Sequence, residues 1–209
     1  MLLPQQGLRW RQGDARPQRL ADGTTVWHGF ITDVTERKRI EAELQEFAST
    51  DSLTQLPNRR HFMARIEAQL AHMRHGGAGA AVMMRDLDHF KSINDRWGHA
   101  IGDEVLRHFA NILRTQLRAG DLAGRTGGEE FAILLAATDL DAAQGIARRI
   151  QERFAAQPLA VADEMVALTV SIGIALMDAA DPGAEAALAR SDFALYRAKK
   201  DGRNRIECA

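Results

Sequence analysis

The chain has 209 residues, a formal net charge of −1 and one cysteine, Cys208. This length fits one large domain, or one ordinary domain with an appendage, and the near-zero charge argues against a broad surface for a nucleic-acid polymer or a membrane. A single cysteine excludes an internal disulfide, which agrees with a cytoplasmic protein, and no apolar run is long enough to be a membrane segment.

Two strand-like runs occupy the first part of the chain, at residues 8–11 and 24–34, and Asp22-Gly23 between them is a typical turn pair. An isolated hairpin is only marginally stable in water because it buries little apolar surface. We therefore expect residues 1–34 to be the end of a domain whose upstream portion is missing from this chain.

Residues 35–49 have a helical pattern, with Asp33 or Thr35 as N-cap and one apolar stripe formed by Ile40, Leu44 and Phe47. The stripe is shorter than the three or four heptads that establish a coiled coil. Two interpretations stay open: the helix packs on its own domain, or it is a signalling linker that brings two copies of the chain together.

Carboxylates follow abruptly after an apolar strand in the next part of the chain. Pro57 ends the preceding segment, a helix runs to about His75, and the buried type of strand at 80–84 leads into Asp86 and Asp88. In strand geometry these two carboxylates point to the same side, and oxygen ligands of this kind suit magnesium or calcium. The alternative is that the acids cap a helix at the start of a loop.

A second acidic pair lies at a glycine-rich turn. The polar segment 92–103 is expected to be a loop or short helix, and an amphipathic helix then runs to about Gly120. Runs at 121–126 and 131–135 form a hairpin whose tip is Gly127-Gly128, where we expect glycines to adopt positive φ, followed by Glu129 and Glu130.

The rest of the chain alternates helices and strands. Asp139 or Asp141 caps a helix, residues 165–177 alternate strongly and predict one long strand, a last helix ends at Gly202, and a short strand covers 205–207. This order predicts an α+β fold in which helices flank a central, largely antiparallel sheet.

Residues 50 to 207 resemble the GGDEF family of diguanylate cyclases, because five motifs occur in the family's order. They are Thr50-Asp51-x-Leu53-Thr54-x-Leu56-x-Asn58-Arg59-Arg60, Asp86-x-Asp88-x-Phe90-Lys91-x-x-Asn94-Asp95-x-x-Gly98-His99-x-x-Gly102-Asp103, Gly127-Gly128-Glu129-Glu130-Phe131, Ser171-Ile172-Gly173 and Leu195-Tyr196-x-Ala198-Lys199-x-x-Gly202-Arg203-Asn204. The resemblance implies a palm-like nucleotidyl cyclase fold for residues 50–209. The chain departs from the family at Gln55, where glycine is usual, at Arg85 within an apolar strand, and at Ser191 in place of alanine.

The resemblance implies that two GTP molecules are condensed into cyclic di-GMP and pyrophosphate in a homodimer that uses Mg²⁺ or Mn²⁺. It assigns the metal to Asp86, the Leu87 carbonyl and Glu129, and proton removal or further metal binding to Glu130. The catalytic set implied is Asp86, Lys91, Glu129 and Glu130. The GTP-binding set implied is Lys91, Asn94, Asp103, Gly127, Gly128, Lys199 and Arg203.

A product-inhibition site is implied by the same resemblance. Arg118 and Asp121 stand at the family's fixed distance before the glycines, and Arg149 on the following helix completes a site for cyclic di-GMP. Taken alone, Arg118 is better explained as a cation at a helix C-terminus.

Residues 1–34 resemble the last strands of a PAS sensor domain, on the basis of Trp10, Pro17, Asp22-Gly23, Trp27-His28-Gly29-Phe30 and the segment 33–38. We therefore expect a PAS fragment, a linker helix at 35–49 and a cyclase domain at 50–209. Two rival functions remain: a catalytically silent domain that binds GTP or cyclic di-GMP, and another metal-dependent nucleotidyl cyclase that shares the palm.

Overall fold

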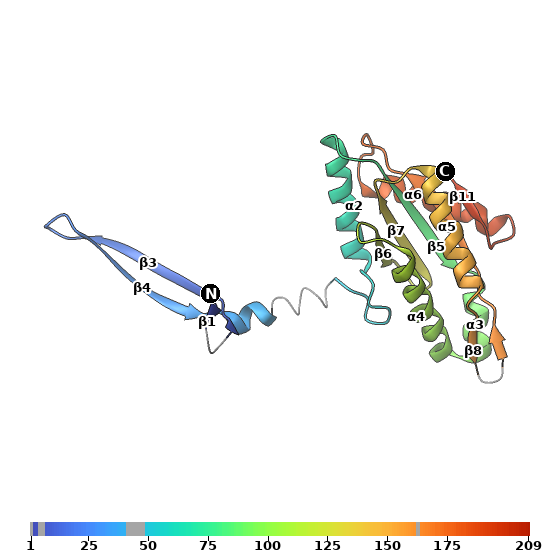
Figure 1. Ribbon diagram of the computed structural model, residues 1–209, viewed down its shortest axis with the longest axis horizontal. Helices are drawn as coiled ribbons and strands as arrows, with labels where there is room; N and C mark the ends of the chain where they lie inside the picture. Colours follow the sequence, from blue (N-terminus) through green and yellow to red (C-terminus); the bar gives the residue numbers. More distant parts are fainter. Residues whose placement is uncertain (1, 4–6, 41–48, 162–163) are drawn as a thin grey trace. The chain divides into compact units, whose positions relative to one another are not determined.

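The computed structural model describes residues 2–3, 7–40, 49–161 and 164–209 of the chain (Figure 1). The chain forms two compact units, Met1–Ala48 and Ser49–Ala209. The boundary lies in the segment that was predicted to be a linker. None of the helices in the described ranges is both long and apolar enough to cross a bilayer.

The first unit is built around one long hairpin. Strand β3 (Arg11–Arg19) pairs antiparallel with β4 (Thr25–Asp33), and the two-residue strands β1 (Leu2–Leu3) and β2 (Gly7–Leu8) pair beside it. The predicted strand at 8–11 was therefore wrong in its extent. Residues 12–19 contain no large apolar side chain. Their pairing therefore comes from backbone bonds to β4, which hydrophobic periodicity does not predict.

A helix begins directly after β4. Residues 35–40 are helical, and the Asp33 carboxylate accepts a hydrogen bond of 2.9 Å from the Thr35 amide. The expected stripe residues Leu44 and Phe47 lie outside the described residues, so the two interpretations of the linker stay open.

The second unit contains a five-stranded sheet in the order β11-β10-β5-β7-β6. The central strand β5 (Ala80–Leu87) is antiparallel to β7 (Glu130–Ala136) and to β10 (Val170–Leu176). The edges are β6 (Leu122–Arg125), antiparallel to β7, and β11 (Ile206–Cys208), parallel to β10. The predicted α+β fold with a largely antiparallel sheet is confirmed.

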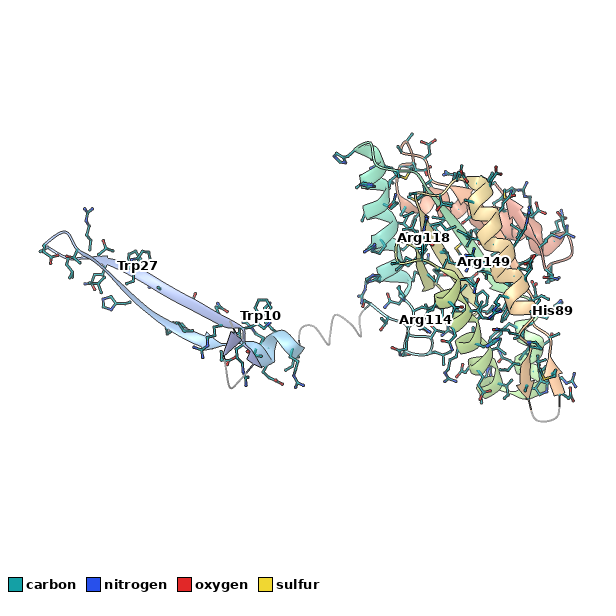
Figure 2. The ribbon with its side chains drawn as sticks, in the orientation of Figure 1. Trp10, Trp27, His89, Arg114, Arg118 and Arg149 are labelled. Carbon is teal, nitrogen blue, oxygen red and sulfur yellow. The ribbon has the colours of Figure 1, made fainter. Side chains whose placement is uncertain are left out.

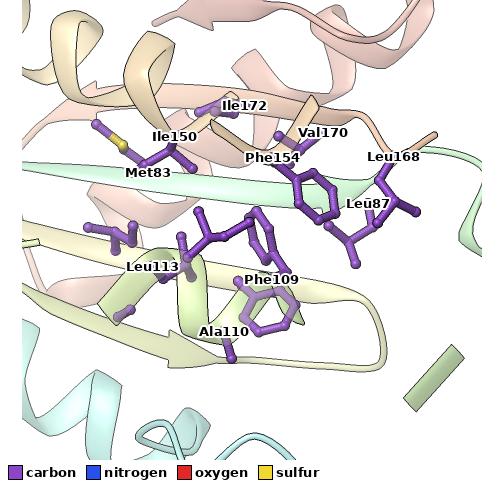
Figure 3. Packing of buried hydrophobic residues seen from close by; sticks show 14 of the residues in the cluster. Met83, Leu87, Phe109, Ala110, Leu113, Ile150, Phe154, Leu168, Val170 and Ile172 are labelled. Carbon is purple, nitrogen blue, oxygen red and sulfur yellow. The ribbon is translucent and has the colours of Figure 1, made fainter. Parts of the chain in front are cut away.

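Helices cover both faces of this sheet. On one face α2 (Arg59–Arg74) and α6 (Ala184–Lys200) enclose a core that includes Phe62, Ile66 and Val82. On the other, α4 (His99–Gln116) and α5 (Leu140–Ala155) enclose a larger cluster, in which the rings of Phe109 and Phe154 are 4.8 Å apart (Figure 3). The expected cap of α5 is confirmed, since the Asp139 side chain accepts from the Ala142 amide.

Two predicted elements differ from the structure. The expected long strand at 165–177 is divided into β9 (Glu164–Val166), which forms a hairpin with β8 (Leu159–Val161), and β10. The division occurs where Thr169 turns its backbone carbonyl and its hydroxyl to Asp88. The segment 92–103 forms most of α3 (Phe90–Trp97) and the start of α4, separated by Gly98 at φ 82°, a value that favours glycine.

Candidate active site

Acidic and basic side chains meet in a cavity of about 260 Å³ at the end of β5. It is lined by Asp86, Leu87, His89, Phe90, Lys91, Ser92, Glu129, Lys199 and Arg203. These residues come from β5, the start of α3, the hairpin between β6 and β7, and the end of α6 with the turn that follows. Six of the residues that the sequence singled out therefore lie around one space, which we call the phosphate cavity: Asp86, Leu87, Lys91, Glu129, Lys199 and Arg203.

The sheet register brings the acids together. Asp86 is paired across the ladder with Glu130 on one side and with Ser171 on the other. Because paired residues of neighbouring strands share a face of the sheet, the carboxylates of Asp86 and Glu130 lie on the face that α2 and α6 cover.

Asp86 is held in an environment that disfavours its charge. Burial raises the pKa of its carboxyl, and the negative charges of Glu129 and Glu130 add to this, while the hydrogen bond and charge of Lys199 oppose it. The Lys199 ammonium lies 2.7 Å from an Asp86 carboxylate oxygen. The carboxylate therefore has a cationic partner, and its neighbours would favour a further positive charge.

The tip of the β6–β7 hairpin differs from the expected tight turn. Among the described residues, the glycines with positive φ are Gly23, Gly76, Gly98 and Gly202. Gly127 and Gly128 therefore do not adopt the left-handed backbone conformation that was expected of them. Four residues separate Arg125 from Glu130, and the amide of Thr126 bonds the Glu130 carbonyl, so a longer loop makes the left-handed turn unnecessary. A Cβ on Gly127 would lie 2.8 Å from a carboxylate oxygen of Glu130, whereas Gly128 faces open space.

The two adjacent glutamates line different cavities. Glu129 belongs to the phosphate cavity, but Glu130 lines a neighbouring cavity of about 370 Å³ between α2 and α6, together with Arg59, Thr126 and Asp192. Both still act on Asp86 through their charge. Glu130 therefore stands beside the expected metal ligands and not among them.

Asp88 does not join Asp86 in the phosphate cavity. Asp88 lies beyond the last residue of β5 and is absent from the lining of the phosphate cavity. Its carboxylate instead accepts from the hydroxyls of Thr169 and Ser171 and from the backbone of Asn204. The Asp88 amide still bonds the Thr169 carbonyl, and Ser171 is the residue paired with Asp86, so the two acids lie on one side of the sheet but bind different partners.

Asn94 and Asp103 lie on adjacent helices, α3 and α4. The side-chain oxygen of Asn94 is so close to Gly102 that a Cβ there would collide with it. The same oxygen is buried and has no hydrogen-bond partner within the described part of the chain. A buried acceptor without a partner is costly, and it is a feature that a bound donor would correct.

Two of the predicted product-site residues, Arg118 and Arg149, lie on the side of the sheet that α4 and α5 cover (Figure 2). Arg118, just beyond α4, bonds Asp121 at 3.2 Å, the Thr138 hydroxyl at 3.0 Å and the Ala136 carbonyl. Arg149, on α5, bonds the side chain and the carbonyl of Gln116. The Asp121 side chain is only 2% exposed, so Arg118 must turn aside before a ligand can reach that carboxylate.

Sequence reasoning gave no role to Arg125 or Asp51, which the structure joins. The Arg125 guanidinium bonds both carboxylate oxygens of Asp51, at 3.1 and 3.2 Å, and the carbonyl of Gly128 at 2.9 Å. Asp51 lies within the first family motif, and Arg125 lies two residues before Gly127. Because 74 positions separate the two residues, no local pattern in the sequence indicates that they are in contact.

The donor set fits a hard divalent cation that also binds phosphate. Within the described ranges no group of three or more His, Cys, Asp or Glu side chains could hold a metal by itself. Asp86, Glu129 and the Leu87 carbonyl would offer two carboxylates and one carbonyl, and magnesium is commonly bound by one or two carboxylates completed by substrate phosphates. The Lys199 ammonium lies beside Asp86, so this position already holds one positive charge.

Comparisons with known proteins agree with this geometry. The family model for "Diguanylate cyclase, GGDEF domain" matches residues 48–205. The diguanylate cyclase DgcP of Pseudomonas aeruginosa is 43% identical over 162 residues, which cover 78% of this chain and 24% of that protein. The chain spans between 24% and 54% of the length of the curated relatives compared.

Solved structures give the same result. The coiled coil and GGDEF domain of DgcB from Caulobacter crescentus, solved in complex with c-di-GMP, superimposes with a TM-score of 0.78 at 31% identity, covering 83% of this chain and 93% of that one. The active GGEEF domain of a diguanylate cyclase from Vibrio cholerae gives a TM-score of 0.69 at 36% identity, covering 74% and 97%. Since the family model covers most of the chain and the fold agrees, this protein belongs to the GGDEF diguanylate cyclase family.

Proposed function

We propose that this chain is a diguanylate cyclase that joins two GTP molecules into cyclic di-GMP and releases pyrophosphate. The observation that carries the proposal is the phosphate cavity, in which Asp86 and Glu129 face the cations of Lys91, Lys199 and Arg203. Such an arrangement suits a triphosphate bound with a divalent metal, and GTP as substrate assigns the activity to the cytoplasm.

In each condensation the ribose 3′ oxygen of one GTP bonds to the α-phosphorus of the other, and the bond from that phosphorus to pyrophosphate breaks. Glu130, which lines the neighbouring cavity and is paired across the sheet with Asp86, takes the proton of the 3′-hydroxyl. Lys91, Lys199 and Arg203 hold the phosphates and neutralise their charge. Gly127 leaves room beside Glu130, where a side chain would collide.

We assign Mg²⁺ or Mn²⁺ to Asp86, the Leu87 carbonyl and Glu129. The metal would lower the pKa of the attacking hydroxyl and spread the negative charge of the phosphate. In the structure Lys199 pairs with Asp86. Metal binding would release that ammonium for the triphosphate.

We assign guanine to Asn94 and Asp103. Once the Asn94 side chain turns its buried, unpartnered oxygen outward, that oxygen can accept from a base, and a carboxylate can accept from N1–H and the N2 amine of guanine. Adenine lacks this pair of donors, and a buried acceptor left unpaired would disfavour it.

We propose that the active form is a homodimer, because one chain offers one phosphate cavity and the reaction needs two nucleotides.

We also propose that residues 1–34 end a PAS sensor domain, because Trp27, Phe30 and Ile31 of β4 are 65 to 71% exposed. In a longer protein that includes the upstream portion, Trp27 should be buried, and its fluorescence should therefore shift to the blue. An unshifted spectrum would contradict the assignment.

The test is to incubate the purified chain with GTP and Mg²⁺ and to separate the nucleotides. We expect cyclic di-GMP, a specific activity that rises with protein concentration, and loss of turnover in a folded Glu129→Ala variant. Binding of GTP with no product from a demonstrated dimer would instead favour the silent receptor. Full activity of Glu129→Ala would overturn the metal assignment.

A further inference from the structure

Asp88 is a buried carboxylate whose bonds lead to the phosphate cavity although its side chain does not line it. It is 5% exposed and stands two residues after Asp86. One oxygen accepts from Ser171 Oγ at 2.7 Å, and the other accepts from Thr169 Oγ1 at 2.8 Å and from the Asn204 amide at 3.0 Å. Its own amide donates to the Thr169 carbonyl at 3.0 Å.

The Asn204 bond fixes a turn of unusual backbone. Gly202, Arg203 and Asn204 have φ values of 112°, 61° and 46°, so two residues with side chains adopt the left-handed region. A residue with a side chain is unfavourable in this region and persists only where its surroundings hold it. The Asn204 amide bonds Asp88 and the Arg203 amide bonds the Ala198 carbonyl near the end of α6, while the next residue, Arg205, accepts from the Ile172 amide.

This turn brings Arg203 to the phosphate cavity, next to Lys199. Arg203 lines the cavity, and the amide of the next residue, Asn204, is bonded to the Asp88 carboxylate. Asp88 therefore connects the strand that carries Asp86 with the turn that carries Arg203.

We propose that Asp88 is a positioning residue of the active site: through the Asn204 backbone it holds Arg203 in place to bind the triphosphate, and it is not a metal ligand. The inference rests on the proposed function, because it takes the phosphate cavity as the triphosphate site.

The chemistry of the contacts explains why a carboxylate stands here. Three donors converge on Asp88, and a carboxylate is an acceptor at every lone pair. An asparagine could keep its oxygen toward Thr169 and Asn204 and turn its amide to Ser171 Oγ, which can accept. Asp88→Asn should therefore keep the Asn204 bond, whereas alanine removes it.

The experiment measures calorimetrically how the whole chain, with Mg²⁺, binds a GTP analogue whose α,β-bridging oxygen is replaced by methylene. Loss of an arginine–phosphate contact in Arg203→Ala should weaken binding about tenfold or more. Asp88→Ala should weaken it several-fold but add little to Arg203→Ala, while Asp88→Asn should stay within about twofold of the wild type. Ser171→Ala, which removes one partner and spares the Asn204 bond, is the matched control.

The outcomes separate the two claims. If Arg203→Ala binds the analogue normally, the phosphate cavity is misassigned and the proposed function loses its support. If Arg203→Ala is weak but Asp88→Ala is normal, or if the two effects multiply in the double variant, Asp88 does not act through Arg203 and the inference is wrong.

A second measurement needs no variant. Hydrogen exchange should show the Asn204 amide protected in the folded wild-type chain, since its bond is to a buried carboxylate. Fast exchange at Asn204 would overturn the inference even if Asp88→Ala fails to fold.

Discussion

Arg85 is the least expected residue of the core. It lies in the middle of β5, is completely buried, and is paired across the sheet with Ile172 and Phe131, so it faces the cluster covered by α4 and α5. Within the described residues its Nη2 contacts the Met83 sulfur, while its Nε and Nη1 have no hydrogen-bond partner. Burial lowers the pKa of Arg85 to about 9, which leaves it charged at neutral pH.

An uncompensated buried charge is destabilising, so replacing it by an apolar side chain of similar length should help. We predict that Arg85→Met raises the free energy of unfolding by about 2 kcal/mol at pH 7, measured by denaturant titration. Arg85→Lys, which keeps a buried cation, is the control and should bring no gain. An Arg85→Met chain less stable than the wild type would mean that the guanidinium has partners supplied by water.

The same prediction has a pH dependence. Because the pKa of Arg85 in the folded chain lies well below the ordinary value that it has in the unfolded chain, the folded state binds fewer protons above pH 9. Stability of the wild type should therefore rise relative to Arg85→Met as the pH increases from about 8 to about 10.5. A constant difference between the two proteins over this range would contradict the assignment.

At the scale of elements, the end of β6 links the start of the cyclase unit to the glycine hairpin. Arg125 bonds Asp51, in the turn before α2, and Gly128 at the hairpin tip. The side chains of Arg125 and Asp51 are 16% and 22% exposed. Burial raises the pKa of Asp51, but hydrogen bonds from Thr54 and Arg125 outweigh it and lower the pKa overall. The stabilisation is therefore present at neutral pH and lost as acid protonates Asp51 below its ordinary range.

A double-mutant cycle with Asp51→Asn and Arg125→Gln should measure this link. We expect a coupling of about 1 kcal/mol in the free energy of unfolding, because the pair is shielded from water. Both single variants should also lower GTP turnover, since the hairpin that carries Glu129 loses its support. The exposed pair Arg96 and Glu164, 60% and 57% exposed, is the control and should couple near zero. Strictly additive effects of the two substitutions on the free energy of unfolding would contradict a stabilising link between Asp51 and Arg125.

The sequence predicted most elements where the signal is local. The cap at Asp139, the apolar strand β5 and the helix α2 follow from side-chain chemistry within a few residues. It failed where distant contacts decide: the strand predicted at 165–177 is divided between β9 and β10 near Thr169, which bonds Asp88, 81 positions away. The phosphate cavity itself combines residues from 86 to 203, which periodicity alone could not bring together; only the family resemblance placed them in one site.

At the scale of the whole molecule, the phosphate cavity and the predicted product site lie at different ends of the sheet. Glu130 begins β7 beside Asp86, whereas Ala136, whose carbonyl Arg118 binds, ends it. At about 3.4 Å per residue the two ends are roughly 20 Å apart, and Figure 2 shows Arg118 apart from His89, which lines the phosphate cavity. Cyclic di-GMP bound at Arg118 therefore could not block the same chain's catalytic groups directly. Inhibition would have to hold two chains in an arrangement that keeps their half-sites apart.

This geometry predicts a separation of rate from feedback. In a GTP time course, Arg118→Ala should keep an initial rate within about twofold of the wild type, because Arg118 is far from the reacting phosphate, but should continue after the wild type slows. Added cyclic di-GMP should inhibit the wild type but not Arg118→Ala, and it should increase the hydrodynamic size of the wild type or fix its dimer in sedimentation. Arg148→Ala removes the same charge from the neighbouring position on α5 and should behave as the wild type. Identical progress curves for Arg118→Ala and the wild type would show that the Arg118 site plays no part in regulation.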